Sequence, residues 1–203
     1  TVAEEIGFPC MIKAGGAGGG RGIRPVRTPQ ELEAQYRSAR DEAIWATGGD
    51  RLFIERLVTR ARHLEVQAVA DRHGNVLTFG VRDCSVQRRN QKIIEETPPP
   101  GLNAALLADI ESSASRLIKA AGYEGAGTVE FLYDLETGKY TFMEVNARLQ
   151  VEHPIPEQSY GVDLVQLQIR VALGEPLPDE TSRRQAAAME VRLNAEDPER
   201  DFA

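Results

Sequence analysis

The sequence predicts an α+β protein, in which antiparallel strands form sheets and helices flank them. Short runs that alternate apolar and polar residues are separated by turns typical of hairpins, at residues 71–75 and 135–138. Two longer segments, 103–121 and 163–173, carry apolar residues at the spacing of amphipathic helices. No run approaches the roughly 20 apolar residues that a membrane-spanning helix needs, so no membrane contact is expected.

The composition is that of an ordinary globular protein. Of the 203 residues, 41% are hydrophobic and 27% are charged, and the length suits one large domain or two small ones. The formal net charge of −7 argues against a general affinity for nucleic acid. Cys10 and Cys84 form no metal-binding or disulfide pattern, and no secretory signal is present. We therefore expect a reducing, cytoplasmic location.

The first part of the chain predicts helices and short strands around a glycine-rich loop. Residues 1–8 resemble a helix end that Gly7 closes, so we expect the chain to be a piece of a longer one. The run Thr28 to Glu31 is typical of a helix start, with Thr as the N-cap, Pro in the first turn and Glu three residues on. This helix should extend to about Ala46. Strands are expected at 9–14, 23–26 and 52–58.

The second part predicts a larger antiparallel sheet with flanking helices. Its expected elements are strands at 63–70, 75–82 and 86–95, a helix at 103–121, strands at 127–134 and 139–146, a helix at 163–173, and a strand at 189–194. A break near residues 59–62 separates the two parts. We therefore expect two domains, at 1–58 and 59–203.

The glycine-rich loop, residues 15–22, is the first candidate site. Backbone N–H groups in such a loop can point at phosphate oxygens, and the lack of side chains permits close approach. Neither familiar phosphate-loop pattern fits, because GxxxxGK[ST] is absent and Arg21 stands where GxGxxG needs a glycine. The loop joins two expected strands, which favours a flap over a nucleotide; a plain linker is the alternative. Lys13 and Arg21 at its ends favour phosphate.

The stretch 142–153 begins like a strand and concentrates polar residues. Side chains two apart on a strand share a face, so one face should carry Phe142, Glu144, Asn146, Arg148, Gln150 and Glu152. The other face should enter a core with Met143, Val145, Leu149 and Val151. Charges on a buried strand need each other or a ligand. The alternative is the exposed face of an antiparallel strand.

Two carboxylates, Glu130 and Glu144, are expected side by side on the strands 127–134 and 139–146. Such a pair repels unless a divalent ion bridges it. With Asn146 it predicts an all-oxygen Mg²⁺ site of the kind that holds nucleotide phosphates.

Two further segments are weaker candidates. In an extended strand Arg88, Asn90 and Lys92 share one face, which can bind phosphate or carbonate or can be solvated. Glu55 ends an apolar strand between the two parts, where nucleotide bases often bind; a surface Glu-Arg pair is the alternative.

Five motifs follow one another along nearly the whole chain. They are Lys13-Ala14 with the glycine loop and Arg21-Gly22, Arg82 to Lys92, Gly125 to Phe131, Glu144 to Pro154, and Arg192 to Pro198. Together they resemble the biotin carboxylase domain of biotin-dependent carboxylases. The resemblance implies an ATP-grasp fold, with a lid-like ATP-binding subdomain at 1–58 and a central subdomain at 59–203 that is truncated at its C-terminal end.

The resemblance also implies an enzyme, an ATP-dependent ligase. ATP and bicarbonate would give carboxyphosphate, its breakdown would release CO₂ and phosphate, and N1′ of biotin would capture the CO₂. The implied ATP-binding residues are Lys13, Gly19, Gly20, Glu55, Val58, His63, Gln87 and Asn90. The implied ligands of two Mg²⁺ or Mn²⁺ ions are Glu130, Glu144 and Asn146. Bicarbonate would meet Lys92, Arg148 and the backbone of Val151, with Glu152 as the base; Arg192 would hold the ureido oxygen of biotin as it gains charge.

Two positions depart from the family pattern, since Asn90 stands where many members have His and Ala17 replaces a loop glycine.

None of the four lysines, Lys13, Lys92, Lys119 and Lys139, lies between two methionines as the family's biotinylated lysine does. Biotin is therefore expected as a substrate on a separate carrier domain. The resemblance further implies a carboxyltransferase domain or subunit as a partner, a homo-oligomer, and low activity for residues 1–203 alone.

Alternative functions stay open at this point. The final carboxyl acceptor can be an acyl-CoA, pyruvate or urea, and the family members with Asn at position 90 include urea carboxylases. Another ATP-grasp ligase, such as half of a carbamoyl-phosphate synthetase, is the next alternative, although the pair Arg148 and Glu152 favours the carboxylase. A nucleotide-binding or scaffolding module without turnover is the third, and the presence of Lys92 and Arg192 argues against it.

Overall fold

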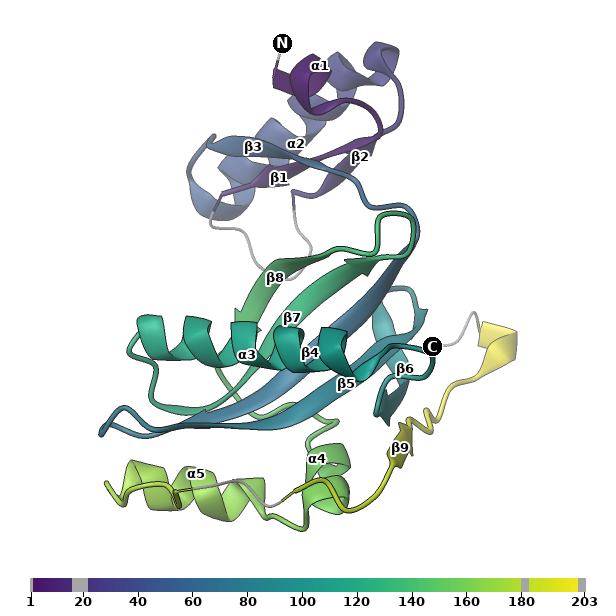
Figure 1. Ribbon diagram of the computed structural model, residues 1–203. Coiled ribbons are helices and arrows are strands. Elements are labelled where there is room, and N and C mark those ends of the chain that lie inside the picture. Colours follow the sequence, from purple (N-terminus) through teal and green to yellow (C-terminus); the bar gives the residue numbers. More distant parts are fainter. Residues whose placement is uncertain (1, 16–21, 180–182, 201–203) are drawn as a thin grey trace. The chain divides into compact units, whose positions relative to one another are not determined.

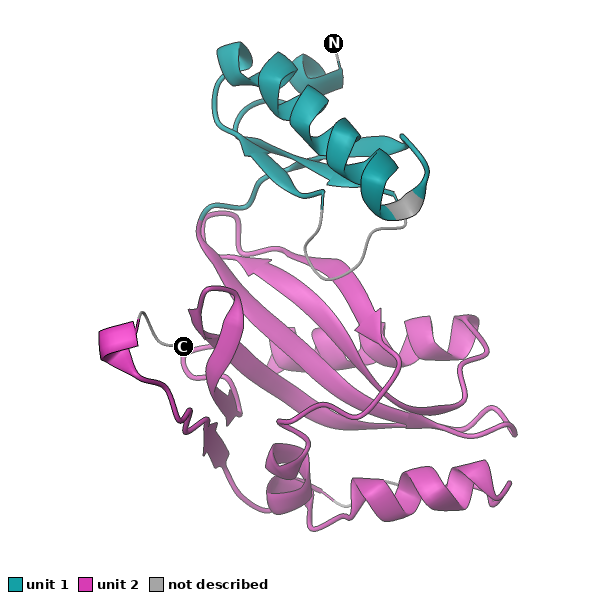
Figure 2. Ribbon diagram, turned by 180° about the vertical axis from the view of Figure 1, so that it is seen from behind, with its two compact units in different colours: residues 1–59 teal, residues 60–203 magenta. Residues whose placement is uncertain are grey.

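The structure is a computed structural model, which describes residues 2–15, 22–179 and 183–200. The chain divides into two compact units, residues 1–59 and residues 60–203 (Figure 2). Among the described residues, no helix combines the length and the apolar character needed to cross a membrane.

The first unit is a three-stranded antiparallel sheet with two α-helices (Figure 1). In this sheet β1 (Cys10–Ala14) lies between β2 (Arg24–Val26) and β3 (Leu52–Arg56). The helices are α1 (Val2–Ile6) and α2 (Leu32–Thr47). Small and branched side chains fill its core: Ala3, Cys10, Ile12, Val26 and Ala39.

The start of the helix predicted at Thr28 differs in detail between the prediction and the structure. A 3-10 turn, η1 (Pro29–Glu31), precedes α2, and the Thr28 side chain makes no capping hydrogen bond. The carboxylate of Glu31 accepts a hydrogen bond from the backbone N–H of Arg27 at 2.9 Å, so the glutamate reaches back as in a capping box. α2 ends where Gly48 adopts the left-handed conformation.

The second unit is a six-stranded antiparallel sheet with the strand order β8-β7-β4-β5-β6-β9. Its strands are β4 (Ala61–Ala70), β5 (Val76–Arg88), β6 (Gln91–Thr97), β7 (Gly125–Asp134), β8 (Tyr140–Asn146) and β9 (Ala188–Val191). A short 3-10 turn, η2 (Pro198–Arg200), follows β9.

Helices cover both faces of this sheet (Figure 1). α3 (Ala104–Ala120) packs on one face, in a core of Leu64, Val66, Ala68, Ala70, Val81, Ile110, Ala114, Ile118, Val129 and Phe131. α4 (Pro154–Tyr160) and α5 (Leu164–Ala172) contribute to a second core, with Val69, Leu77, Phe79, Ala126, Tyr160, Leu164 and Val171. Because successive residues of a strand point to opposite faces, the even-numbered residues of β4 face α3 and the odd-numbered ones face away from it.

The strand predicted at 86–95 is wrong. β5 continues to Arg88, and a tight hairpin at Arg89 and Asn90 leads into β6. Both turn residues have positive φ, 51° and 64°, which a two-residue hairpin of this type requires and which asparagine tolerates well. Arg88, Asn90 and Lys92 therefore do not share one strand face; Lys92 pairs with Gln87 across the hairpin.

The predicted strand 139–146 is confirmed as β8, which ends at Asn146. The alternation of faces expected through Glu152 therefore does not continue along a strand. A β-bulge interrupts the β7–β8 pairing, since Glu130 pairs with Glu144 but the next residue, Phe131, pairs with Phe142. Phe142 therefore lies on the face opposite to Glu144, with its ring centroid 6.4 Å from that of Phe131. Val151, predicted to enter a core, is 61% exposed.

The helix α4 has no counterpart among the predicted elements. It begins at Pro154 and ends where Gly161 adopts the left-handed conformation. Proline in the first turn and glycine after the last are ordinary helix boundaries, so the signal was present in the sequence.

Candidate active site

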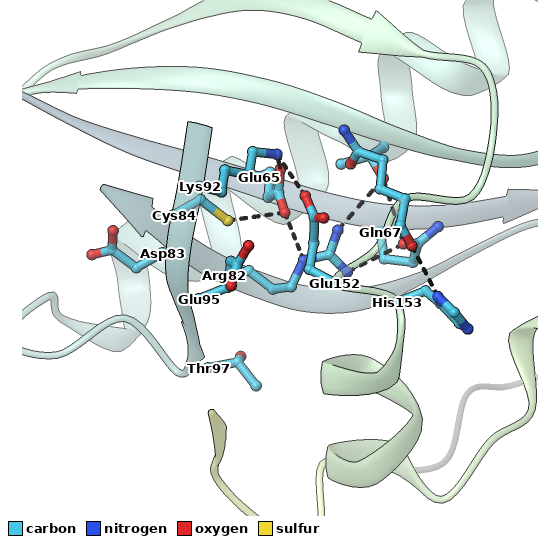
Figure 3. A network of polar contacts seen from close by, with 12 residues as sticks. Glu65, Gln67, Arg82, Asp83, Cys84, Lys92, Glu95, Thr97, Glu152 and His153 are labelled. Carbon is cyan, nitrogen blue, oxygen red and sulfur yellow. Dashed lines mark hydrogen bonds and ion pairs between the residues drawn. The ribbon is translucent and has the colours of Figure 1, made fainter. Parts of the chain in front are cut away.

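A fully buried carboxylate, Glu65 on β4, lies at the centre of a polar network (Figure 3). Its Oε1 accepts hydrogen bonds from Arg82 Nε at 2.8 Å and from Cys84 Sγ at 3.0 Å. Its Oε2 lies 2.5 Å from Lys92 Nζ. Burial acts to raise the pKa of Glu65, but the charges of Arg82 and Lys92 outweigh it, so the pKa is well below the ordinary value. Glu65 is therefore held as an anion.

The ammonium group of Lys92 is surrounded by three carboxylates. Besides Glu65, its Nζ contacts Glu130 Oε1 at 3.0 Å and Glu152 Oε1 at 2.6 Å. Burial acts to lower the pKa of Lys92, but the neighbouring carboxylates, Glu65 first, raise it well above the ordinary value. Lys92 is therefore a fixed cation between anions that would otherwise repel one another.

An irregularity in the β5–β6 pairing brings Lys92 and Glu95 into the same network. Val86 pairs with Ile94 but the next residue, Gln87, pairs with Lys92, so β6 contains one extra residue here. A bulge of this kind interrupts the alternation of side chains. Strict alternation would send residues 92 and 95 to opposite faces, and the bulge lets both reach the polar side (Figure 3).

Glu152 and Arg192 complete this part of the site. Glu152 is buried just before α4, and its Oε2 accepts a hydrogen bond from Arg192 Nη2 at 2.8 Å. Arg192, which directly follows β9, also donates through Nε to Glu95 at 2.8 Å. Three of the four predicted catalytic residues, Lys92, Glu152 and Arg192, therefore lie in one connected network.

The predicted pairing of Glu130 with Glu144 is confirmed, because the two residues are direct partners on β7 and β8. Glu130 is buried, and its Oε1 accepts hydrogen bonds from Asn146 Nδ2 at 3.0 Å and from Gln150 Nε2 at 3.3 Å. Burial acts to raise the pKa of Glu130, but the His63 side chain and the charge of Lys92 lower it. Glu130 is thus an anion with amide groups beside it.

These oxygen donors fit a hard divalent ion. Glu130, Glu144 and Asn146 offer carboxylate and amide oxygens, the ligands that Mg²⁺ prefers. A second set of possible ligands consists of His63, Glu65 and Glu130. One ligand atom from each of these residues lies within 4.8 Å of the other two. Glu130 belongs to both sets, so a cation at this site would depend on it most.

His63 and Gln87, predicted to lie near the nucleotide, contact each other, and His63 also contacts Glu130. Gln87 Nε2 lies 2.8 Å from His63 Nδ1 and donates to the carbonyl oxygen of Cys84 at 2.8 Å. His63 Nε2 lies 3.1 Å from Glu130 Oε2. Because the amide donates to Nδ1, the proton of a neutral His63 is assigned to Nε2, which faces the carboxylate.

The other predicted residues lie elsewhere. Arg148 is exposed, and its Nη1 donates to the carbonyl oxygen of Leu149 at 3.2 Å. In the first unit Lys13 Nζ lies 2.5 Å from the carboxylate of Glu55, and Val58 is half-buried after the end of β3. Gly19, Gly20 and the loop residue Arg21 lie outside the described residues.

Sequence reasoning missed several members of the network. Apart from their place in a motif or segment, no role was predicted for Glu65, Gln67, Arg82, Cys84 and Glu95. A signal for two of them was present, because His63, Glu65 and Gln67 alternate with apolar residues along the predicted strand 63–70. Polar residues at alternate positions of a buried strand indicate a second polar face.

Acidic groups outnumber basic ones in the network. Glu65, Glu95, Glu130 and Glu152 are buried, and the cations that contact them are Arg82, Lys92 and Arg192. Buried charges are tolerated when they are balanced. The excess of negative charge therefore favours the binding of a cation.

The chain matches the family model described as "Carbamoyl-phosphate synthase L chain, ATP binding domain" over residues 1–180. It is 49% identical over 203 residues to the chloroplastic biotin carboxylase of Arabidopsis thaliana, covering 99% of this chain and 38% of that protein. It is 48% identical to the propionyl-CoA carboxylase alpha chain of Ruegeria pomeroyi, covering 99% of this chain and 30% of that one. The chain thus spans less than half the length of these relatives.

A solved structure is similar over the whole chain. The biotin carboxylase domain of Hydrogenobacter thermophilus 2-oxoglutarate carboxylase, a dimer in complex with MgADP, ADP and bicarbonate, superposes with a TM-score of 0.89 at 44% identity. The match covers 100% of this chain and 45% of that one. This likeness confirms the ATP-grasp fold that the sequence motifs implied.

Proposed function

The chain belongs to the family of the carbamoyl-phosphate synthase L chain ATP-binding domain, and we propose that it carries out ATP-dependent carboxylation of biotin with bicarbonate. This is the first half-reaction of a biotin-dependent carboxylase. The similarity to biotin carboxylases supports this reaction over carbamoyl phosphate synthesis. The final carboxyl acceptor would be chosen by a separate carboxyltransferase.

The observation that carries the proposal is the connected set of Lys92, Glu152 and Arg192. Lys92 is a fixed cation that can attract the bicarbonate anion, and Glu152 is a carboxylate within 2.6 Å of it that can accept the bicarbonate proton. The deprotonated oxygen would attack the terminal phosphorus of ATP, giving carboxyphosphate and ADP. Arg148 and the backbone of Val151 would contribute further contacts to bicarbonate.

Carboxyphosphate would then separate into CO₂ and phosphate. The phosphate would take the proton from N1′ of biotin, and N1′ would form its new bond to the carbon of CO₂. Negative charge moves onto the ureido oxygen of biotin as the proton leaves. Arg192 offers a guanidinium to that oxygen, and such stabilisation is strongest for a charge that develops during the reaction.

Glu130, Glu144 and Asn146 are the residues that would hold two Mg²⁺ or Mn²⁺ ions. The ions, when bound, would neutralise charge on the ATP phosphates. His63, Gln87 and Asn90 would contact ATP from the second unit. In the first unit the corresponding residues are Lys13, Gly19, Gly20, Glu55 and Val58.

We further propose a biotin carboxyl carrier domain and a carboxyltransferase as partners, together with a homo-oligomeric state and a cytoplasmic location. One relative is an alpha chain, and the solved neighbour is a dimer, which supports assembly. None of the lysines of this chain has the methionine neighbours of a biotinylated lysine, which supports a separate carrier.

The test is the release of ADP from ATP, measured with and without bicarbonate and free biotin. The protein should be assayed with any sequence that adjoins residues 1–203 in nature. We expect ADP release to require bicarbonate and to rise with biotin. Glu152→Gln should lower it by roughly 10²- to 10⁴-fold, as expected for loss of a general base.

Glu136→Gln is the matched control, because Glu136 is exposed in the turn between β7 and β8. This variant should retain the rate of the unchanged protein. ADP release that is indifferent to bicarbonate, or a Glu152→Gln variant as active as the control, would refute the proposed reaction.

A further inference from the structure

Two carboxylates hold the guanidinium of Arg192, and they differ in their surroundings. Glu95 Oε1 accepts a hydrogen bond from Nε at 2.8 Å and lies 2.6 Å from Nη2. Glu152 Oε2 accepts from Nη2 at 2.8 Å, while the other oxygen of Glu152 binds Lys92. Glu152 is thus shared between two cations, whereas the described ion-pair contacts of Glu95 are with Arg192.

Glu95 lies fully buried on β6, and its Oε2 has no hydrogen-bond partner among the described residues. Its direct neighbour across the β6–β9 pairing is another acid, Glu190. Burying a carboxylate beside a second one is unfavourable unless a cation compensates. Arg192 is the cation in contact with it.

The backbone around Arg192 is held independently of Glu95. The N–H of Arg192 donates to the carbonyl oxygen of Ile93 at 2.9 Å, continuing the pairing of β6 with β9. Beyond it, Arg88 Nη2 lies 2.5 Å and 2.6 Å from the two carboxylate oxygens of Glu196. Glu95 is therefore not needed to keep this segment in place, and its contact acts on the guanidinium.

The proposed reaction changes the charge of one partner only. When Glu152 accepts a proton from bicarbonate, its attraction for Arg192 falls, because a neutral carboxyl binds a guanidinium less strongly than a carboxylate does. Glu95 makes no described contact with Lys92 and lies outside that proton transfer. It can hold the guanidinium while Glu152 is neutral.

We propose that Glu95 is a positioning residue, which holds the guanidinium of Arg192 in place for biotin while Glu152 handles the proton. This inference rests on the proposed function. It assigns the biotin-dependent step, and not the formation of carboxyphosphate, to the pair Glu95 and Arg192.

The experiment compares Glu95→Gln, Glu95→Asp and the control Glu96→Gln, made in the protein with its natural adjoining sequence. Glu96 neighbours Glu95 on β6, and it pairs with Asp83 and Met189. In Glu95→Gln, the rate of biotin-dependent carboxylation should fall roughly 10- to 100-fold, because a misplaced guanidinium of Arg192 would no longer meet biotin in the productive geometry. Bicarbonate-dependent ADP release without biotin should stay within about twofold, because carboxyphosphate formation does not use Arg192.

Glu95→Asp keeps the charge, and an ion pair with Arg192 can re-form across a slightly longer gap. The logarithm of its biotin-dependent rate should therefore lie at least about midway from that of Glu95→Gln to that of the unchanged protein. Glu96→Gln should match the unchanged protein in both assays. Equal losses of the biotin-dependent and biotin-independent rates, or a melting temperature that falls without any change in their ratio, would show a merely structural role and overturn the proposal.

A measurement without catalysis separates this inference from the proposed function. The Nε–H group of Arg192 donates to Glu95, so its ¹⁵N–¹H signal should exchange slowly with solvent. Exchange should become at least about tenfold faster in Glu95→Gln and stay unchanged in Glu96→Gln. Unchanged exchange in Glu95→Gln would overturn the proposal even if the enzyme is active. Absence of biotin-dependent activity in the unchanged protein would instead refute the proposed function.

Discussion

Replacing Lys92 by methionine would remove the central cation of the network while keeping a side chain of similar length. Its ammonium contacts three carboxylates, at 2.5 Å from Glu65, 3.0 Å from Glu130 and 2.6 Å from Glu152. Those carboxylates are almost completely buried. The variant therefore leaves three anions close together without the charge between them.

The size of the effect follows from the partners that remain. Breaking a buried ion pair by removing one partner costs about 3–5 kcal/mol of unfolding free energy. In this network each carboxylate keeps another contact: Glu65 keeps Arg82, Glu152 keeps Arg192, and Glu130 keeps the amide groups beside it. The expected loss therefore lies at the lower end, about 3 kcal/mol at pH 8.

The loss should depend on pH with a defined sign. Lys92 lowers the pKa of Glu65 and Glu130, so its removal raises both values. Carboxyls with raised pKa destabilise the folded state while they are charged, and this cost shrinks as pH falls and they take up protons. Lys92→Met should therefore be closer to the unchanged protein at pH 5 than at pH 8.

Urea unfolding at the two pH values measures this difference. Lys139→Met is the matched control, because Lys139 is exposed next to the β7–β8 turn. It should change the unfolding free energy by less than about 0.5 kcal/mol. If Lys92→Met costs no more than this control, or if its cost does not shrink at pH 5, the account of the network given above is incorrect.

Two further predictions concern the framework of the second unit. Gly80 has φ +70° and an added Cβ would lie 2.6 Å from Tyr160 Oη, so Gly80→Ala should lower stability by about 2–3 kcal/mol in thermal unfolding. Adding Tyr160→Phe should restore part of this loss, and no recovery would contradict the clash. Asp71 accepts backbone hydrogen bonds from His73, Asn75 and Leu177, and although burial opposes it, these bonds lower its pKa to about 2. Because the folded pKa lies below the unfolded one, its contribution of about 1–2 kcal/mol should be present above pH 4 and lost as pH falls through the folded pKa of about 2. Asp71→Asn should therefore be less stable than the unchanged protein at pH 7, and the gap should narrow between pH 4 and pH 2 and close below it. A gap that stays constant with pH would contradict this reasoning.

Local patterns in the sequence were sufficient for most helices, strands and turns. Alternation of apolar residues in 127–134 and 139–146 predicted two paired strands, and it also placed Glu130 opposite Glu144 as the structure does. The helix at 103–121 was predicted from apolar spacing and occurs at Ala104–Ala120, with Asn103 as its cap. These features depend on residues close together in the chain, whose preferences are readable one segment at a time.

The errors in the predicted strands and side-chain faces arose where the alternation of side chains was assumed to continue through a tight turn or a β-bulge. The hairpin at Arg89 and Asn90 has no glycine, so the run 86–95 looked continuous. The bulge between Phe142 and Glu144 reverses the faces that simple counting assigns. Bulges and tight turns change the sheet face on which a side chain lies. Contacts with distant parts of the chain offset the free energy that such irregularities cost, so the local sequence does not reveal them.

Residue types and their spacing therefore established the fold class, the pairing of two acids on neighbouring strands, and the motifs that identify the family. They did not show that Glu65 lies at the centre of the charges, that Lys92 joins three acids, or that Glu95 shares Arg192 with Glu152. Those contacts join residues up to 97 positions apart, through hydrogen bonds that exist only once the sheet has formed. Charge balance in a buried site is a property of the assembled sheet, because each group finds its partners across strands and not along them.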